Sequence, residues 1–358
     1  MSFGSYLGGP GHDSYNVPLE LFQENRRKLA DRLAALALAK KKEKKESEND
    51  NDNANANNII KKYVVVMKGG PSPTRYDTDN EPIFRQESYF WWLTGVKEPD
   101  CSLVITIDCS CSVDVDDDAD DDAKTPKIEY ALFVPKLPAS YATMMGKIRT
   151  LEEWKHLYGV DGGVYFNDDL ENFVEERVVL VQDSNADKTT KSAISTSSSD
   201  SSSRVLLMCG QNTDSGMMYE ERMPEVFSNT LSKALTSTST STSSYSIIDT
   251  TTLFPILADC RVYKSKLELQ LLEHVAQITS FAHAYVMRNI KPGMYEYQCE
   301  SLFKHYSYYN YGSRLQSYTN ICGCGPNAAI LHYGHTGEPN ASLIQEKDNC
   351  LFDMVSLV

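Results

Sequence analysis

Hydrophobic runs along the chain predict a region in which strands and helices alternate. Between residues 60 and about 255, short runs rich in β-branched and other apolar residues are typical of buried strands. The runs lie at 63–67, 103–108, 130–134, 178–181 and 205–208, with a helical segment at about 150–157. This alternation predicts one α/β domain.

Two other segments have the three-to-four-residue spacing of amphipathic helices. Residues 19–46 carry apolar side chains at this spacing after Pro18, which suits a first helical turn. Further along, Ser265 and Glu268 form a capping box ahead of a long apolar repeat, and Pro292-Gly293 closes it. The second helix therefore opens another domain. Its further predicted elements are a helix at 296–305 and a buried strand at 350–354.

Four stretches have too few apolar residues to form a packed core. Residues 40–58 and 109–127 are rich in charged and amide side chains, and 195–203 and 236–244 are serine and threonine tracts. The acidic run in 109–127 is not an EF-hand calcium loop, because it lacks the glycine turn and the final glutamate of that motif. All four stretches are therefore predicted to be disordered segments or surface loops. The expected domains are 1–59 (helix and insert), 60–258 (α/β) and 259–358.

Composition narrows the classes of partner. Forty-nine acidic against 35 basic residues give a net charge of −14, which argues against nucleic-acid binding. No stretch has the length and apolarity of a membrane span or a secretory signal, so we expect a cytoplasmic protein. Cys109/Cys111 and Cys322/Cys324 are C-x-C pairs, and this spacing favours reduced thiols over a structural zinc site.

Candidate chemistry is concentrated in the last 45 residues. His332 and His335 lie among apolar residues and glycine turns, and Asp353 interrupts an apolar strand. A buried carboxylate at that position has to be paired or bound to a metal ion. From the residues alone, a hydrogen-bonded core histidine and an aspartate in a turn or cap remain open as alternatives.

Seven segments, in order along the chain, resemble the prolidase family of Xaa-Pro dipeptidases. Three of them resemble the family's amino-terminal domain: FRQESYFWWLTGVKEPDC (84–101), ALFVPKLPASYATMMGKI (131–148) and GQNTDSG (210–216). Four resemble its catalytic domain: ADCRVYKSKLELQLLE (258–273), SLFKHY (301–306), SYTNICGCGPNAAILHYGHTGEPN (317–340) and CLFDM (350–354). Ordered matches over most of the chain are far more specific than one short motif.

The resemblance implies a fold and an activity. The fold class is α/β (α+β): a creatinase-like amino-terminal domain followed by the first part of a pita-bread metallopeptidase domain. The implied enzyme is a cytoplasmic homodimer that hydrolyses dipeptides with carboxyl-terminal proline, using two Mn(II) ions, which suit carboxylate and imidazole ligands.

The resemblance also assigns residues. His332 matches the histidine that contacts the substrate, and Asp353 matches the first metal-binding aspartate. His335 has no family role, so a structural histidine is expected there. Arg85 and Trp91-Trp92 fall in a segment that in the family also shapes the site entrance and the dimer contact, and core packing is expected for the tryptophans.

The chain departs from the family pattern after Asp353. The family supplies a further aspartate, a histidine and two glutamates as metal ligands, whereas this sequence reads Val355-Ser356-Leu357-Val358. We therefore expect a truncated prolidase whose chain does not itself bind the two manganese ions. Two alternatives are an inactive interaction protein that retains the amino-terminal domain and an enzyme similar to aminopeptidase P.

Overall fold

The described part of the chain forms two compact units. A computed structural model describes residues 17–47, 60–110, 125–179, 203–208, 248–334 and 340–357. Among these residues, unit 1 comprises those up to Leu21 and those from Lys264 onward, and unit 2 comprises those from Phe22 to Tyr263. In the described residues no helix combines the length and the apolar character that crossing a membrane requires.

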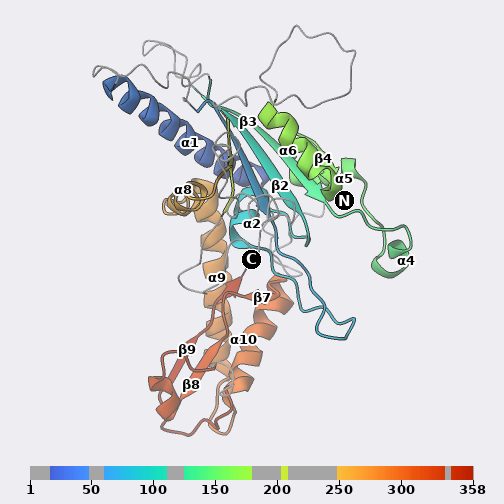
Figure 1. The fold of residues 1–358 in the computed structure, drawn as a ribbon. Coiled ribbons are helices and arrows are strands. Elements are labelled where there is room, and N and C mark those ends of the chain that lie inside the picture. Colours follow the sequence, from blue (N-terminus) through green and yellow to red (C-terminus); the bar gives the residue numbers. More distant parts are fainter. Residues whose placement is uncertain are drawn as a thin grey trace. The chain divides into compact units, whose positions relative to one another are not determined.

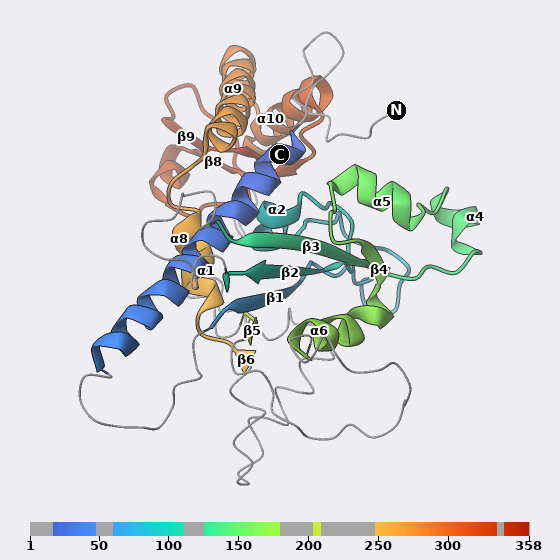
Figure 2. The same ribbon diagram turned by 90° about the horizontal axis from the view of Figure 1, so that it is seen from above.

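Unit 2 is built on a six-stranded mixed sheet with the strand order β4-β3-β2-β1-β5-β6 (Figures 1 and 2). The strands are β1 (Lys62–Lys68), β2 (Ser102–Asp108), β3 (Lys127–Val134), β4 (Val164–Phe166), β5 (Ser203–Leu206) and β6 (Ile248–Asp249). The β1/β2 and β2/β3 pairs are antiparallel, and the other three pairs are parallel. Four of the five predicted strands are therefore confirmed.

The two faces of this sheet bury alternate residues of each central strand. In β1, Tyr63, Val65 and Met67 belong to one hydrophobic cluster, while Val64 and Val66 belong to another on the opposite face. Side chains alternate between faces in a strand, so a sheet covered on both sides needs apolar residues at every position. This is why the sequence there reads as an unbroken apolar run.

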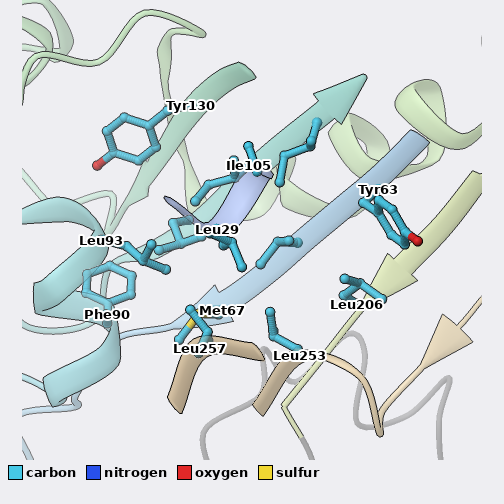
Figure 3. Packing of buried hydrophobic residues seen from close by; sticks show 14 of the residues in the cluster. Leu29, Tyr63, Met67, Phe90, Leu93, Ile105, Tyr130, Leu206, Leu253 and Leu257 are labelled. Carbon is cyan, nitrogen blue, oxygen red and sulfur yellow. The ribbon is translucent and has the colours of Figure 1, made fainter. Parts of the chain in front are cut away.

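Four helices contribute to the larger cluster. They are α1 (Leu19–Ser47), α2 (Ser88–Thr94), α5 (Leu151–Tyr158) and α8 (Leu253–Cys260). In Figure 3, Leu29 of α1 and Leu257 of α8 lie with Phe90 of α2 and Met67 of β1 in one packed layer. The first predicted helix thus packs within unit 2, although it was expected to form a separate segment with its insert.

The helix predicted over residues 19–46 is confirmed as α1, which ends at Ser47. The disorder also predicted for residues 40–58 is wrong for residues 40–47. Lysine and glutamate dominate residues 40–47, and both are good helix formers. Residues 48–59 lie outside the described residues, as does the predicted insert at 236–244. Most of the inserts predicted at 109–127 and 195–203 also lies outside them, although β3 already begins at Lys127 and β5 at Ser203.

The opposite face is covered by α6 (Leu170–Val179). Its Phe173 ring packs on Phe133 of β3 at a centroid distance of 5.1 Å. The strand predicted at 178–181 is therefore wrong, because residues 178 and 179 continue this helix. Leu170, Phe173 and Val174 recur at helical spacing and are buried, and this packing overrides the β propensity of the valines that follow.

Unit 1 contains two long helices and two short sheets. The helices are α9 (Lys266–Asn289) and α10 (Glu296–Tyr311), and the strands are β7 (Leu315–Gln316), β8 (Ile321–Cys324), β9 (Cys350–Asp353) and β10 (Ser356–Leu357). β8 pairs with β9 and β7 with β10, both antiparallel. The predicted capping box is confirmed at the start of α9: Glu268 N–H donates to Ser265 Oγ at 3.2 Å, and Ser265 N–H donates to Glu268 Oε2 at 2.6 Å.

The core of unit 1 lies between these helices and the β8/β9 pair. It consists of Ala282, Val286, Cys299, Phe303, Cys322, Cys324, Ile344 and Met354. Three short elements complete the described helices: α4 (Tyr141–Met145) and the 3-10 turn η2 (Asn167–Asp169) in unit 2, and the 3-10 turn η4 (Gly325–Ala329) in unit 1. The η4 turn leads from β8 toward His332.

Candidate functional site

His332 lies at the surface of unit 1, directly after the η4 turn. Its side chain is exposed, whereas the next residue, Tyr333, is only 2% exposed. The Tyr333 hydroxyl donates a hydrogen bond of 2.7 Å to Glu296 Oε2. The histidine is thus available to solvent while its neighbour anchors the backbone. His335 lies outside the described residues.

Glu296, the first residue of α10, is fully buried. Its Oε1 accepts hydrogen bonds from Cys324 N–H at 2.7 Å and from the Asn327 amide at 3.2 Å. Its Oε2 accepts the Tyr333 hydroxyl and, at 3.0 Å, Ser342 N–H. Burial alone would raise the pKa of this carboxyl, but the hydrogen bonds outweigh it and hold the pKa below the usual value.

A second buried polar side chain joins the segments around β8. Asn340 Oδ1 accepts from Cys322 N–H at 3.0 Å, and its amide donates to Asn320 O at 3.0 Å and to Glu300 Oε2 at 2.8 Å. Asn340 has a positive φ of 52°, a conformation that asparagine tolerates better than most residues. Together with Glu296 it ties the β8 segment to α10.

Asp353 is the last residue of β9 and pairs with Ile321 across the sheet. The strand expected at 350–354 is confirmed as β9, but its expected burial is wrong, because Asp353 and Leu351 are exposed and Met354 is the residue that enters the core. Within the described residues β9 pairs with β8 alone. The Tyr318 hydroxyl donates a hydrogen bond to Asp353 Oδ1. Burial, together with this carboxylate, raises the pKa of Tyr318 to about 12.

The described residues do not fit a two-manganese site. No group of three or more His, Cys, Asp or Glu side chains that could hold a metal ion occurs in this part of the chain. The β8/β9 register pairs Asp353 with Ile321, the first residue of β8, whereas the segment to His332 begins after Cys324, the last residue of β8. One exposed carboxylate can supply one ligand, and a pair of manganese ions needs several oxygen and nitrogen ligands each.

Sequence reasoning missed Glu296, Asn340 and Tyr318. A glutamate in the first turn of a helix normally complements the helix dipole at the surface, so its type and place gave no sign of burial. The partners of Glu296 lie 28 to 46 residues further along the chain. Such separations leave no local pattern.

Two family models match the chain, one on each side of residue 263. Residues 22–184 match the aminopeptidase P N-terminal domain, and residues 270–358 match metallopeptidase family M24. Residues 270–358 therefore resemble the M24 metallopeptidases. This family uses divalent metal ions, as the resemblance implied, and the expected fold class is confirmed as an aminopeptidase P N-terminal domain followed by part of an M24 domain.

Curated relatives match most of the chain. The Xaa-Pro dipeptidases of Pongo abelii and Homo sapiens are each 37% identical over 345 residues, which is 96% of this chain and 54% of theirs. A probable Xaa-Pro aminopeptidase of Aspergillus terreus is 26% identical over 279 residues, 77% of this chain and 44% of its own. The chain thus spans about half the length of the curated relatives it matches.

Solved structures with the same fold include the low-pH form of aminopeptidase P from Escherichia coli. It superposes with a TM-score of 0.62 at 19% identity, over 96% of this chain and 60% of its own. Proline aminopeptidase P II from Yersinia pestis gives the same TM-score at 18% identity, over 95% and 60%. The roles of His332 and Asp353 stay predictions.

Proposed function

We propose that the protein containing this chain is a metal-dependent Xaa-Pro dipeptidase. The observation that carries the proposal is the 37% identity to curated Xaa-Pro dipeptidases, which extends over 96% of the chain and so includes both units. The chain would supply the aminopeptidase P-like domain and the first part of the catalytic domain. We place the protein in the cytoplasm, as a homodimer.

The bond before proline requires a dedicated hydrolase. Its nitrogen has no N–H and the ring fixes φ, so an enzyme that binds an extended backbone through its donors fits this substrate poorly. We propose that His332 contacts the dipeptide and that Asp353 is a metal ligand. Both side chains are exposed in the described structure, which suits contact with a ligand.

Two Mn(II) ions are the proposed metal. The described residues do not form a site for two ions. Asp353 would therefore be one ligand among several, and residues outside the described ones would supply the rest. An aminopeptidase P of the same fold has been solved in a zinc-substituted form with product, which supports a divalent ion in this fold.

The test is a substrate panel on the native protein, isolated from its own cells with an antibody against unit 2. With Mn(II) present, we expect the protein to release proline from Gly-Pro. We expect no hydrolysis of Gly-Ala, whose peptide bond has an ordinary N–H. Failure to cleave Gly-Pro would refute the proposal.

A second candidate is an aminopeptidase P-like activity, favoured by the fold match to the Escherichia coli enzyme and by the Aspergillus terreus relative. The tripeptide Gly-Pro-Ala separates the two. Cleavage of this tripeptide without cleavage of Gly-Pro would assign the protein to the second activity. A native protein that is free of metal and cleaves neither peptide would be an interaction protein that keeps the fold alone.

A further inference from the structure

One buried carboxylate connects the start, the middle and the end of the segment that leads to His332. Glu296 accepts hydrogen bonds from Cys324, where β8 ends, from Asn327 within η4, and from Tyr333, next to His332. Its fourth donor, Ser342 N–H, belongs to the chain that follows. The segment 324–333 is therefore attached at three points to one side chain.

That side chain has a rigid base. Glu296 is the first residue of the 16-residue helix α10, and its own N–H donates to Ser342 O at 3.0 Å. Further along the same helix, Cys299 and Phe303 are fully buried in the core of unit 1. The core thus fixes the backbone that carries the carboxylate, and the four hydrogen bonds hold the side chain itself.

The chemistry of the four partners requires a carboxylate. All four partners donate, and an ionised carboxylate offers acceptor sites on both oxygens. A glutamine of the same shape offers one accepting oxygen and one amide that donates. In one orientation of the glutamine, its NH2 group faces the Cys324 N–H, and in the other orientation it faces the Ser342 N–H. In both cases two donors face each other.

We propose that Glu296 is a positioning residue, which holds the segment 324–333 so that the exposed His332 is presented in one place to the substrate. The proposal rests on the proposed function only in assigning His332 to substrate contact. Glu296 itself is fully buried and acts through Tyr333 and the backbone, not by touching the dipeptide.

The experiment uses the chain 1–358 and four variants. Glu296→Gln replaces one of the two accepting oxygens with a donating NH2 group, and Tyr333→Phe removes one hydroxyl and keeps the ring. Glu300→Gln is the matched control: it neutralises a carboxylate one turn along α10, which binds Asn340 and Lys304. Two readouts are followed, hydrogen exchange of the Cys324 and Ser342 amides and the NMR signal of the His332 ring, identified by its absence in His332→Gln.

In Glu296→Gln we expect exchange of one of the two amides, the one that faces the glutamine NH2 group, to rise about ten- to hundredfold, the effect of leaving a buried donor unsatisfied. The His332 signal should shift or broaden in Glu296→Gln and in Tyr333→Phe, and stay in place in Glu300→Gln. A role in fold stability alone would raise exchange but leave the signal of the exposed ring unchanged.

A His332 signal that ignores both Glu296→Gln and Tyr333→Phe would overturn the proposal, as would an equal shift in Glu300→Gln. If Glu296→Gln does not fold, Tyr333→Phe carries the test with the same expected shift. Absence of Gly-Pro cleavage by the native protein would refute the proposed dipeptidase and leave these two readouts as they are, so the two failures are distinguishable.

Discussion

Phe303 offers the sharpest test of how the candidate site is supported. Its ring is fully buried in the core of unit 1, in a cluster with Ala282, Val286 and Cys322, and it lies 5.1 Å from the His283 ring. Phe303→Ala removes the ring and leaves a cavity beneath β8. Such truncations cost about 3–5 kcal/mol, a substantial part of the roughly 5–15 kcal/mol that holds a domain folded.

The assay is native-state hydrogen exchange resolved along the chain. The protein's three tryptophans, Trp91, Trp92 and Trp154, lie in unit 2, so their fluorescence does not follow the core of unit 1 directly. We expect the amides of α9, α10 and β8 to lose protection in Phe303→Ala by the amount above. Phe303→Leu keeps most of the apolar volume and should lose clearly less.

Leu93→Ala in unit 2 is the complementary control, because Leu93 is equally buried but belongs to the other core. It should cost about 2–5 kcal/mol and lower the urea midpoint seen by tryptophan fluorescence. The reasoning fails if Phe303→Ala changes the protection of β8 and α10 by less than about 1 kcal/mol, the scale of an ordinary surface substitution.

Three further predictions concern pH, capping and backbone conformation. The pKa of Glu296 is lowered by folding, so its contribution to stability is complete above about pH 4.5 and is lost as the pH falls through the folded-state value. Hydrogen exchange of the unit 1 amides, measured at a series of pH values, should show this loss of stability. In Glu296→Gln the loss should be absent. Ser265→Ala should cost about 1 kcal/mol through loss of the capping box, measured as faster exchange in the first turn of α9, and unchanged exchange would contradict the role of the cap. Gly95 has a φ of 70°, and an added Cβ would lie 2.4 Å from the Phe22 ring. Gly95→Ala should therefore lower the urea midpoint of unit 2 by the equivalent of at least about 1 kcal/mol. An unchanged midpoint would contradict this reasoning.

The elements that the sequence predicted well are those whose signal is local. The run Tyr63–Met67 is apolar at every position because both faces of β1 are covered, and Ser265 with Glu268 marks the start of α9 through contacts three residues apart. The valines at 178–179 misled because burial of Phe173 and its neighbours on the sheet decides for a helix.

The site was predicted less completely than the fold. Exposure of Asp353 follows from which strands lie beside β9, and the sequence of the strand alone does not reveal this. Glu296 is defined by four donors that come from distant segments, so only the assembled unit 1 identifies it. His332 and Asp353 were selected through family resemblance, because lone histidines and strand aspartates have ordinary structural roles as well.

The most direct test of the proposed function is the metal content and Gly-Pro turnover of the native protein, measured together for the wild type and for Asp353→Asn. We predict that the wild type contains divalent metal, releases proline and stops doing so when the metal is chelated, and that Asp353→Asn loses both metal and turnover. Full turnover by the chelated protein or by Asp353→Asn would contradict a metal-dependent dipeptidase in which Asp353 is a ligand.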